Sequence, residues 1–146
     1  MKGPIVHPTD FSPASRAAFA RAVALARDEG AELLLVNVLP SVMPLDGDGY
    51  MSPKTYDDVQ RSIRAQAQNE IDKLLAKAKA ARVRARGLLL DGTPADAITR
   101  AARAKHANVI VMGTHGRTGL ARLLMGSVAE RVVGTAPCPV LTVRGK

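Results

Sequence analysis

Cysteine, aromatic residues and long apolar runs are scarce in this sequence, and each scarcity excludes a class of protein. The single cysteine, Cys138, cannot form an internal disulfide, which favours a reducing compartment. Tryptophan is missing and only two Phe and two Tyr occur, so stacking platforms for single-stranded nucleic acid are lacking. No apolar run approaches the roughly 18 residues of a membrane helix, and the first residues lack the apolar stretch of a signal peptide. We therefore expect a cytoplasmic protein whose partners include neither a membrane nor a specific nucleic acid.

The remaining composition is that of an ordinary globular domain. The chain has 146 residues, of which 47% are hydrophobic and 23% are charged, enough for one sizeable core. Lys and Arg number 21 against 13 Asp and Glu, a net charge of +8 that favours anionic partners such as nucleotides. Because these basic residues are dispersed among acidic neighbours, we expect most of them to form a solvated surface.

Predicted strands and helices alternate along the chain. The apolar runs predict strands that begin at Ile5 and Val6 and then span Leu33 to Leu39, Val83 to Leu90, Asn108 to Met112 and Val140 to Val143. Helices are predicted from Ser12 to Gly30, from Asp57 to Ala81, from Thr93 onwards and from Ser127 to about Gly134, with Ser12, Thr93 and Ser127 as caps. The segment from Pro40 to Pro53 is predicted to be a loop. Five strands alternating with four helices imply an α/β fold with a parallel, doubly wound sheet.

A glycine-rich stretch, Val109 to Val128, follows the pattern of a strand, a loop and a helix. Its apolar start runs into Gly113, and further glycines follow at Gly116, Gly119 and Gly126. Such a loop can direct several backbone N–H groups at one anion, and the next helix adds the positive end of its dipole. Two interpretations stay open for this pattern: a phosphate-binding loop, or a loop whose glycines serve only tight turns.

A second polar loop is expected to face the first. In parallel sheets, ligands bind beyond the carboxyl ends of the strands, where the strand order reverses. The loop from Pro8 to Ser12 follows the first strand, and the loop from Gly113 to Ser127 follows the fourth. Both contain polar groups that a plain connecting turn does not need, and this convergence points to one site.

The spacing Gly113-x2-Gly116-x9-Gly126-Ser127 resembles the nucleotide-binding signature of the universal stress protein family. Pro8 to Ser12, Val36 to Val38, Gly92 to Pro94 and Pro137 to Val140 match the family in the same order. The resemblance implies one Rossmann-like domain over residues 1–146, with a five-stranded parallel sheet in the order 3-2-1-4-5 and helices on both faces. It also implies a homodimer through the fifth strand, Val140 to Val143, and binding of ATP, with Mg²⁺, as cofactor.

The resemblance also assigns residues to the two ends of the nucleotide. Asp10 and Val38 would meet the adenine and ribose, Pro8 and Thr9 would shape that wall, and Met112 would pack near the base or sugar. The phosphates would be surrounded by seven residues: Gly113, His115, Gly116, Arg117, Gly126, Ser127 and Val128. Asn37 departs from the family, which often has a histidine there, and His7 stands where many members carry an aliphatic residue.

Three classes of function remain after the sequence is considered. The first is a stress or signalling module in which occupancy by ATP changes the dimer. The second is a weak ATPase or self-phosphorylating enzyme, although a Walker A lysine motif and a second acidic cluster are both missing. The third is an interaction protein that needs no nucleotide, which the intact glycine signature disfavours. We expect no efficient catalysis and at most slow hydrolysis of ATP.

Overall fold

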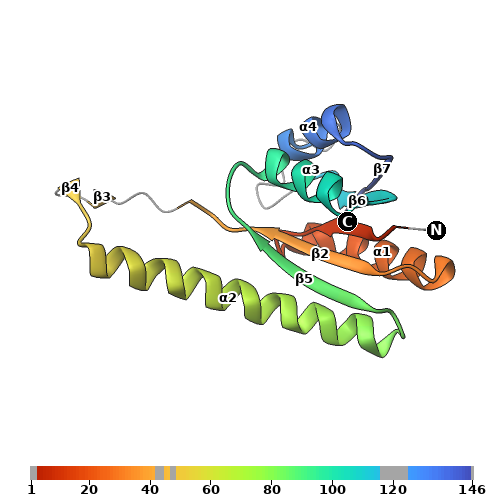
Figure 1. The fold of residues 1–146 in the computed structure, drawn as a ribbon, viewed down its shortest axis with the longest axis horizontal. Coiled ribbons are helices and arrows are strands. Elements are labelled where there is room, and N and C mark those ends of the chain that lie inside the picture. Colours follow the sequence, from red (N-terminus) through yellow and green to blue (C-terminus); the bar gives the residue numbers. More distant parts are fainter. Residues whose placement is uncertain (1–2, 42–44, 47–48, 116–124, 146) are drawn as a thin grey trace.

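Five parallel strands form the centre of the protein, in the order β5-β2-β1-β6-β7 (Figure 1). The computed structural model describes residues 3–41, 45–46, 49–115 and 125–145. The strands are β1 (Ile5–Pro8), β2 (Leu33–Val38), β5 (Ala85–Leu90), β6 (Val109–Gly113) and β7 (Val140–Val143). In the order in which these five strands occur along the chain, this is the predicted arrangement 3-2-1-4-5. The prediction of the α/β fold and of its sheet order is therefore confirmed.

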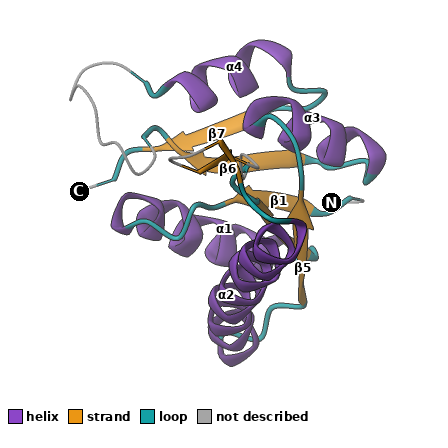
Figure 2. Cartoon of the chain, turned by 90° about the vertical axis from the view of Figure 1, so that its left-hand side faces the viewer, coloured by secondary structure: helices purple, strands orange, loops and turns teal. Residues whose placement is uncertain are grey.

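Helices cover both faces of the sheet (Figure 2). One face carries α1 (Arg16–Glu29) and α2 (Pro53–Ala80), and the other carries α3 (Pro94–Ala104) and α4 (Ser127–Thr135). Alternate residues of β2 enter two separate cores: Leu35 packs in the cluster of α1 and α2, whereas Leu34 packs in that of α3 and α4. Both leucines are fully buried, because a parallel strand between two helical layers has no solvated side.

The N-caps of the helices differ from the prediction at Ser127, Ser12 and Thr93. Helix α4 has Gly126 as its N-cap, so Ser127 is the first helical residue and its predicted capping role is wrong. The cause is the Gly126 N–H, which donates to Thr114 O and fixes the non-helical backbone before Ser127. Ser12 precedes a short 3-10 turn, η1 (Pro13–Ser15), and its hydroxyl caps nothing. The side chain of Thr93, at the N-cap of α3, makes no capping bond either.

Helix α2 starts four residues earlier than predicted and extends beyond the sheet (Figure 1). Ser52 caps it by accepting a hydrogen bond from the Thr55 N–H, a signal that apolar periodicity does not carry. Its buried residues, Ala67, Ile71 and Ala78, all lie in the second half of the helix. The predicted loop before α2 contains a short antiparallel pair, β3 (Leu45–Asp46) and β4 (Gly49–Tyr50). In the part of the chain that the structure describes, no helix is long and apolar enough to cross a membrane.

Candidate functional site

A cleft of about 340 Å³ opens at the carboxyl ends of β1, β2 and β6, beside the first turn of α4. Ten of the predicted site residues line it: Pro8, Thr9, Asp10, Val38, Met112, Gly113, His115, Gly126, Ser127 and Val128. The other two, Gly116 and Arg117, lie outside the described residues. Ser15, Asn37, Pro94, Ile98, Thr114 and Ala129 also line the cleft and were not predicted from the sequence. The two loops that were expected to face each other therefore share one cavity, of a volume typical for small-molecule sites.

The loop after β1 is held by hydrogen bonds from its own polar side chains. Ser15 Oγ donates to Ser12 O over 2.8 Å, so the Thr9 hydroxyl, 3.1 Å away, donates to Ser15 Oγ. The same Thr9 oxygen accepts from the Phe11 N–H at 3.0 Å, and Phe11 has a positive φ of 64°. The Thr9 hydroxyl thus donates once and accepts once inside the loop, and the Thr9 N–H donates to Val36 O at 2.8 Å, so Thr9 mainly shapes the wall of the cleft.

The carboxylate of Asp10 is positioned at this end of the cleft. Its Oδ1 accepts from the Ser12 N–H at 2.9 Å. From β2, the buried side chain of Asn37 donates through Nδ2 to Thr9 O at 2.9 Å. Asn37, which departs from the family pattern in the sequence, thus fixes the residue that precedes Asp10. An anionic group at this end disfavours phosphate and favours a hydrogen-bond donor such as an amine or a hydroxyl.

The opposite side of the cleft is built around the N-terminus of α4. The first hydrogen bond of the helix runs from the Glu130 N–H to Gly126 O at 3.0 Å. The N–H groups of Ser127, Val128 and Ala129 consequently have no partner within the helix. Together with the helix dipole they form a site that suits an anion. Ala129 also lines the cleft and was missed by sequence analysis, because its methyl side chain carries no binding group.

Thr114 joins this side of the cleft to the edge strand of the sheet. Its N–H donates to Val143 O of β7 at 3.1 Å, and its carbonyl accepts from the Gly126 N–H at 2.6 Å. Its hydroxyl lies 3.0 Å from Nδ1 of His115. A ligand that captures the Gly126 N–H therefore has to compete with Thr114.

Two signature glycines occupy positions whose backbone conformation does not require glycine. Gly126 has φ −63° and ψ 157°, a conformation open to any residue. A Cβ on Gly113 would meet His115 O at 3.4 Å and Ala14 O at 3.5 Å, which are ordinary contact distances. A turn explains neither glycine, and internal packing does not explain Gly113. Close approach of a ligand to the backbone does explain them, because a side chain would fill the space that the ligand needs.

His7 lies beneath the site in β1 and is fully buried. Its Nδ1 bonds to Val111 O at 2.8 Å, and because a carbonyl only accepts, this nitrogen carries the hydrogen. Nε2 is buried and has no hydrogen-bond partner among the described residues. Burial lowers the pKa of His7 to about 4, although the Val111 carbonyl and the charge of Asp10 act in the opposite direction. The imidazole is therefore neutral near pH 7.

Resident metal ligands do not form part of the described site. Within the ranges given above, no group of three or more His, Cys, Asp or Glu side chains could hold a metal ion. The chemistry that the cleft supports is thus anion binding at the α4 end and recognition of polar, uncharged groups at the Asp10 end.

The chain is similar to known proteins of one family. The model of the universal stress protein family matches residues 1–144. Universal stress protein MJ0531 of Methanocaldococcus jannaschii is 38% identical over 144 residues, which are 96% of this chain and 81% of that protein. The solved structure of the hypothetical protein MJ0577, subject of a structure-based assignment of biochemical function, matches with a TM-score of 0.83 and 26% identity, covering 100% of this chain and 98% of that one.

Two further solved structures share the fold and contain a nucleotide. One is a universal stress protein in complex with cAMP, with a TM-score of 0.71 and 24% identity over 99% of this chain and 98% of that chain. The other is the universal stress protein of Archaeoglobus fulgidus in complex with dAMP, with a TM-score of 0.67 and 22% identity over 97% of this chain and 98% of that chain.

Proposed function

This chain belongs to the universal stress protein family, and from that premise we propose that it is an ATP-binding module of the stress response. Residues 1–146 act as one nucleotide-binding domain. The adenine and ribose lie at the end formed by Pro8, Thr9, Asp10, Val38 and Met112. The phosphates lie at the end formed by Gly113, His115, Gly116, Arg117, Gly126, Ser127 and Val128.

The observation that carries this proposal is a pair of glycines in the cleft whose backbone conformation does not require glycine. Gly113 and Gly126 line the same cleft, and neither has a conformation that requires glycine. The residues of the first turn of α4, whose N–H groups have no partner within the helix, also line this cleft, and such groups suit a phosphate. The nucleotides in the complexes with cAMP and dAMP have the same base, which supports an adenine nucleotide as the ligand class.

Binding, rather than rapid turnover, is the proposed activity. Mg²⁺ would arrive with the triphosphate, since the described residues provide no metal site of their own. Efficient phosphoryl transfer needs a positioned base or water together with a held metal. The cleft supplies phosphate-binding N–H groups but no such arrangement among the described residues, so we propose at most slow hydrolysis.

Occupancy of the cleft would be transmitted to a homodimer through β7. This strand lies at the edge of the sheet, and Leu141 on it is 37% exposed. Thr114 connects the two places, because it bonds to Val143 of β7 and to Gly126 of the phosphate end. A phosphate that takes the Gly126 N–H away from Thr114 would change how Thr114 is held, and with it the hydrogen bond from Thr114 to β7. The stability of the dimer would change as a result.

The direct test is to denature freshly purified protein and to identify released small molecules by chromatography and mass spectrometry, with calorimetric titration of the nucleotide-free protein. We expect an adenine nucleotide in the first measurement or ATP binding in the second. Failure of both would overturn the proposal. ATP turnover that exceeds that of a Ser127→Ala control would favour an enzyme instead.

A matched pair of substitutions at Gly126 tests the phosphate end. The φ of −63° suits both alanine and proline. Alanine keeps the N–H but adds a Cβ, whereas proline also removes the N–H and with it the hydrogen bond to Thr114 O. We expect Gly126→Ala to weaken ATP binding by about tenfold and Gly126→Pro by clearly more, in calorimetry. Equal affinity of both variants and the original protein would show that the ligand does not approach this residue.

A further inference from the structure

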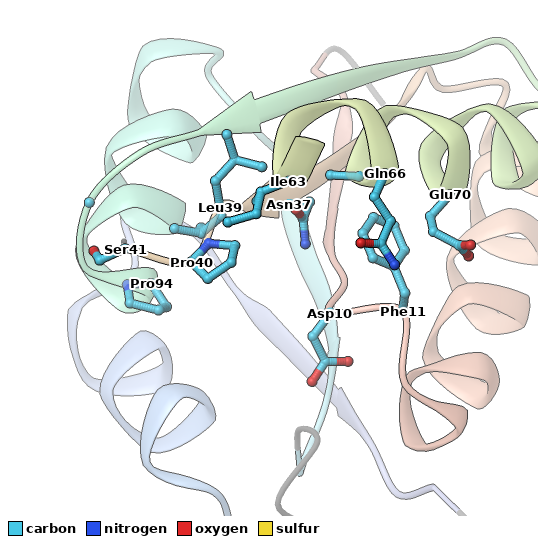
Figure 3. A pocket seen from close by; sticks show the side chains of 13 residues that line it. Asp10, Phe11, Asn37, Leu39, Pro40, Ser41, Ile63, Gln66, Glu70 and Pro94 are labelled. Atoms are coloured by element: carbon cyan, nitrogen blue, oxygen red, sulfur yellow. The ribbon is translucent and has the colours of Figure 1, made fainter. Parts of the chain in front are cut away.

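A second cavity, of about 620 Å³, adjoins the cleft at its Asp10 end (Figure 3). Four residues line both cavities: Asp10, Asn37, Val38 and Pro94. The rest of the second cavity is formed by α2, by the segment that leaves β2, and by Phe11 and Gly92. In Figure 3 the side chains of Ile63, Gln66 and Glu70 descend from α2, opposite Asp10. The two cavities therefore adjoin and have these four lining residues in common.

The lining of the second cavity suits an uncharged, largely apolar group. Phe11, Leu39, Pro40, Ile63 and Ala67 supply apolar surface. No lysine or arginine belongs to its described lining, and the carboxylate of Glu70 is paired with Lys73 at 3.1 Å. To a phosphate, its described lining offers the carboxylates of Asp10 and Glu70 and no basic side chain, in contrast to the N–H groups in the first turn of α4. The other polar side chains of the described lining are the neutral ones of Asn37, Ser41 and Gln66.

The orientation of the proposed nucleotide then decides which of its atoms faces this space. With the phosphates at α4 and the base at Asp10 and Val38, the edge of adenine farthest from the ribose points to the shared wall. That edge carries the N6 amino group, whereas C8 lies on the ribose side.

We propose that the second cavity is a subsite for an uncharged apolar substituent on N6 of the bound adenine nucleotide, a proposal that rests on the function proposed above. The nucleotide site thus selects for the phosphates and the base but leaves the N6 edge open. The wall of α2 around Gln66 limits the size of the substituent.

Base-substituted nucleotides test this subsite in calorimetric titrations of the full chain. The ligands are ATP, N6-benzyl-ATP and ATP with a benzylamino group at C8. We expect N6-benzyl-ATP to bind at least as tightly as ATP, and the C8 derivative to bind about tenfold more weakly, because its substituent meets the ribose side of the cleft. A substitution at the exposed Gln66 supplies the second arm: Gln66→Trp fills the second cavity from α2.

Gln66→Trp should weaken the binding of N6-benzyl-ATP by about tenfold while ATP changes by less than about threefold. The matched control is Gln68→Trp, on an exposed residue of the same helix that bonds to Asp72 and does not line this cavity. It should change neither ligand. Weaker binding of N6-benzyl-ATP than of ATP to the original protein would overturn this proposal alone, as would an unaltered preference in Gln66→Trp. No binding of ATP itself would overturn the proposed function, and the subsite with it.

Discussion

A buried imidazole such as that of His7 makes the stability of the fold depend on pH. In the folded protein the pKa of His7 is about 4, against the ordinary value of 6.5, because burial disfavours the charged ring. Between these two values the unfolded chain binds a proton that the folded chain does not. Acid therefore favours unfolding, and the contribution of His7 is present above pH 6.5 and is lost as the pH falls towards 4.

We expect this residue to account for about 3 kcal/mol of the stability lost between pH 7.5 and pH 4. The comparison is with His7→Asn, whose amide can still donate to Val111 O but does not titrate. Urea unfolding at several pH values should give a steeper loss of stability for the original protein than for the variant. Parallel curves would show that His7 is not the group responsible, whatever the variant's absolute stability.

Some site residues could be predicted from the sequence and others could not, for a physical reason. Asp10, Gly113 and Gly126 follow apolar strands or precede a helix, so the local sequence pattern is enough to identify them. Asn37 acts on Thr9, 28 positions away in the sequence, and Ala129 has only a methyl group to mark its place in the cleft. Residue type alone does not disclose contacts of these two kinds.

At the scale of elements, α2 and β5 meet so closely that one strand position admits no side chain. A Cβ on Gly87 would overlap Cγ2 of Ile71, which is fully buried and β-branched, and so cannot easily turn away. We expect Gly87→Ala to lower the free energy of unfolding by about 1–3 kcal/mol, as overpacking does, in urea denaturation.

A double-mutant cycle with Ile71→Ala separates this clash from other effects of alanine in the strand. Removing Cγ2 of Ile71 also removes the atom that the new Cβ would meet. In the Ile71→Ala background, Gly87→Ala should therefore cost almost nothing. A full cost in that background would assign the effect to the strand itself and not to the contact.

The boundaries of elements were predicted well where local signals decide and poorly where tertiary contacts do. Gly30 ends α1 with a left-handed conformation, as expected of a glycine at that place. The Ser-x-x-Glu pattern at Ser127 is equally regular, yet the bond between Gly126 and Thr114 sets the start of α4 one residue away. The early start of α2 rests on Ser52, in a stretch without apolar periodicity.

For the whole molecule, the edge strand β7 is where the proposed homodimer can be tested. Leu141→Lys places a charge on an apolar residue that is 37% exposed, and we expect it to weaken the dimer by at least about tenfold in sedimentation velocity. Ala76→Lys, on an exposed position of α2, is the control and should leave the dimer intact.

The dissociation constant of the dimer of the original protein should also change when ATP is added. An unchanged constant would remove the proposed coupling.

We expect the two halves of α2 to differ in how long their backbone hydrogen bonds stay closed. The helix is 28 residues long, about 42 Å, whereas the six residues of β5 beneath it span about 20 Å. Only its second half is anchored by buried side chains. The first turns can therefore open in a local event that leaves the sheet folded, whereas amides near Ile71 exchange with deuterium only when the core itself unfolds. The free energy of opening that hydrogen exchange measures at each amide should thus rise along α2, from that of a surface segment to the free energy of global unfolding.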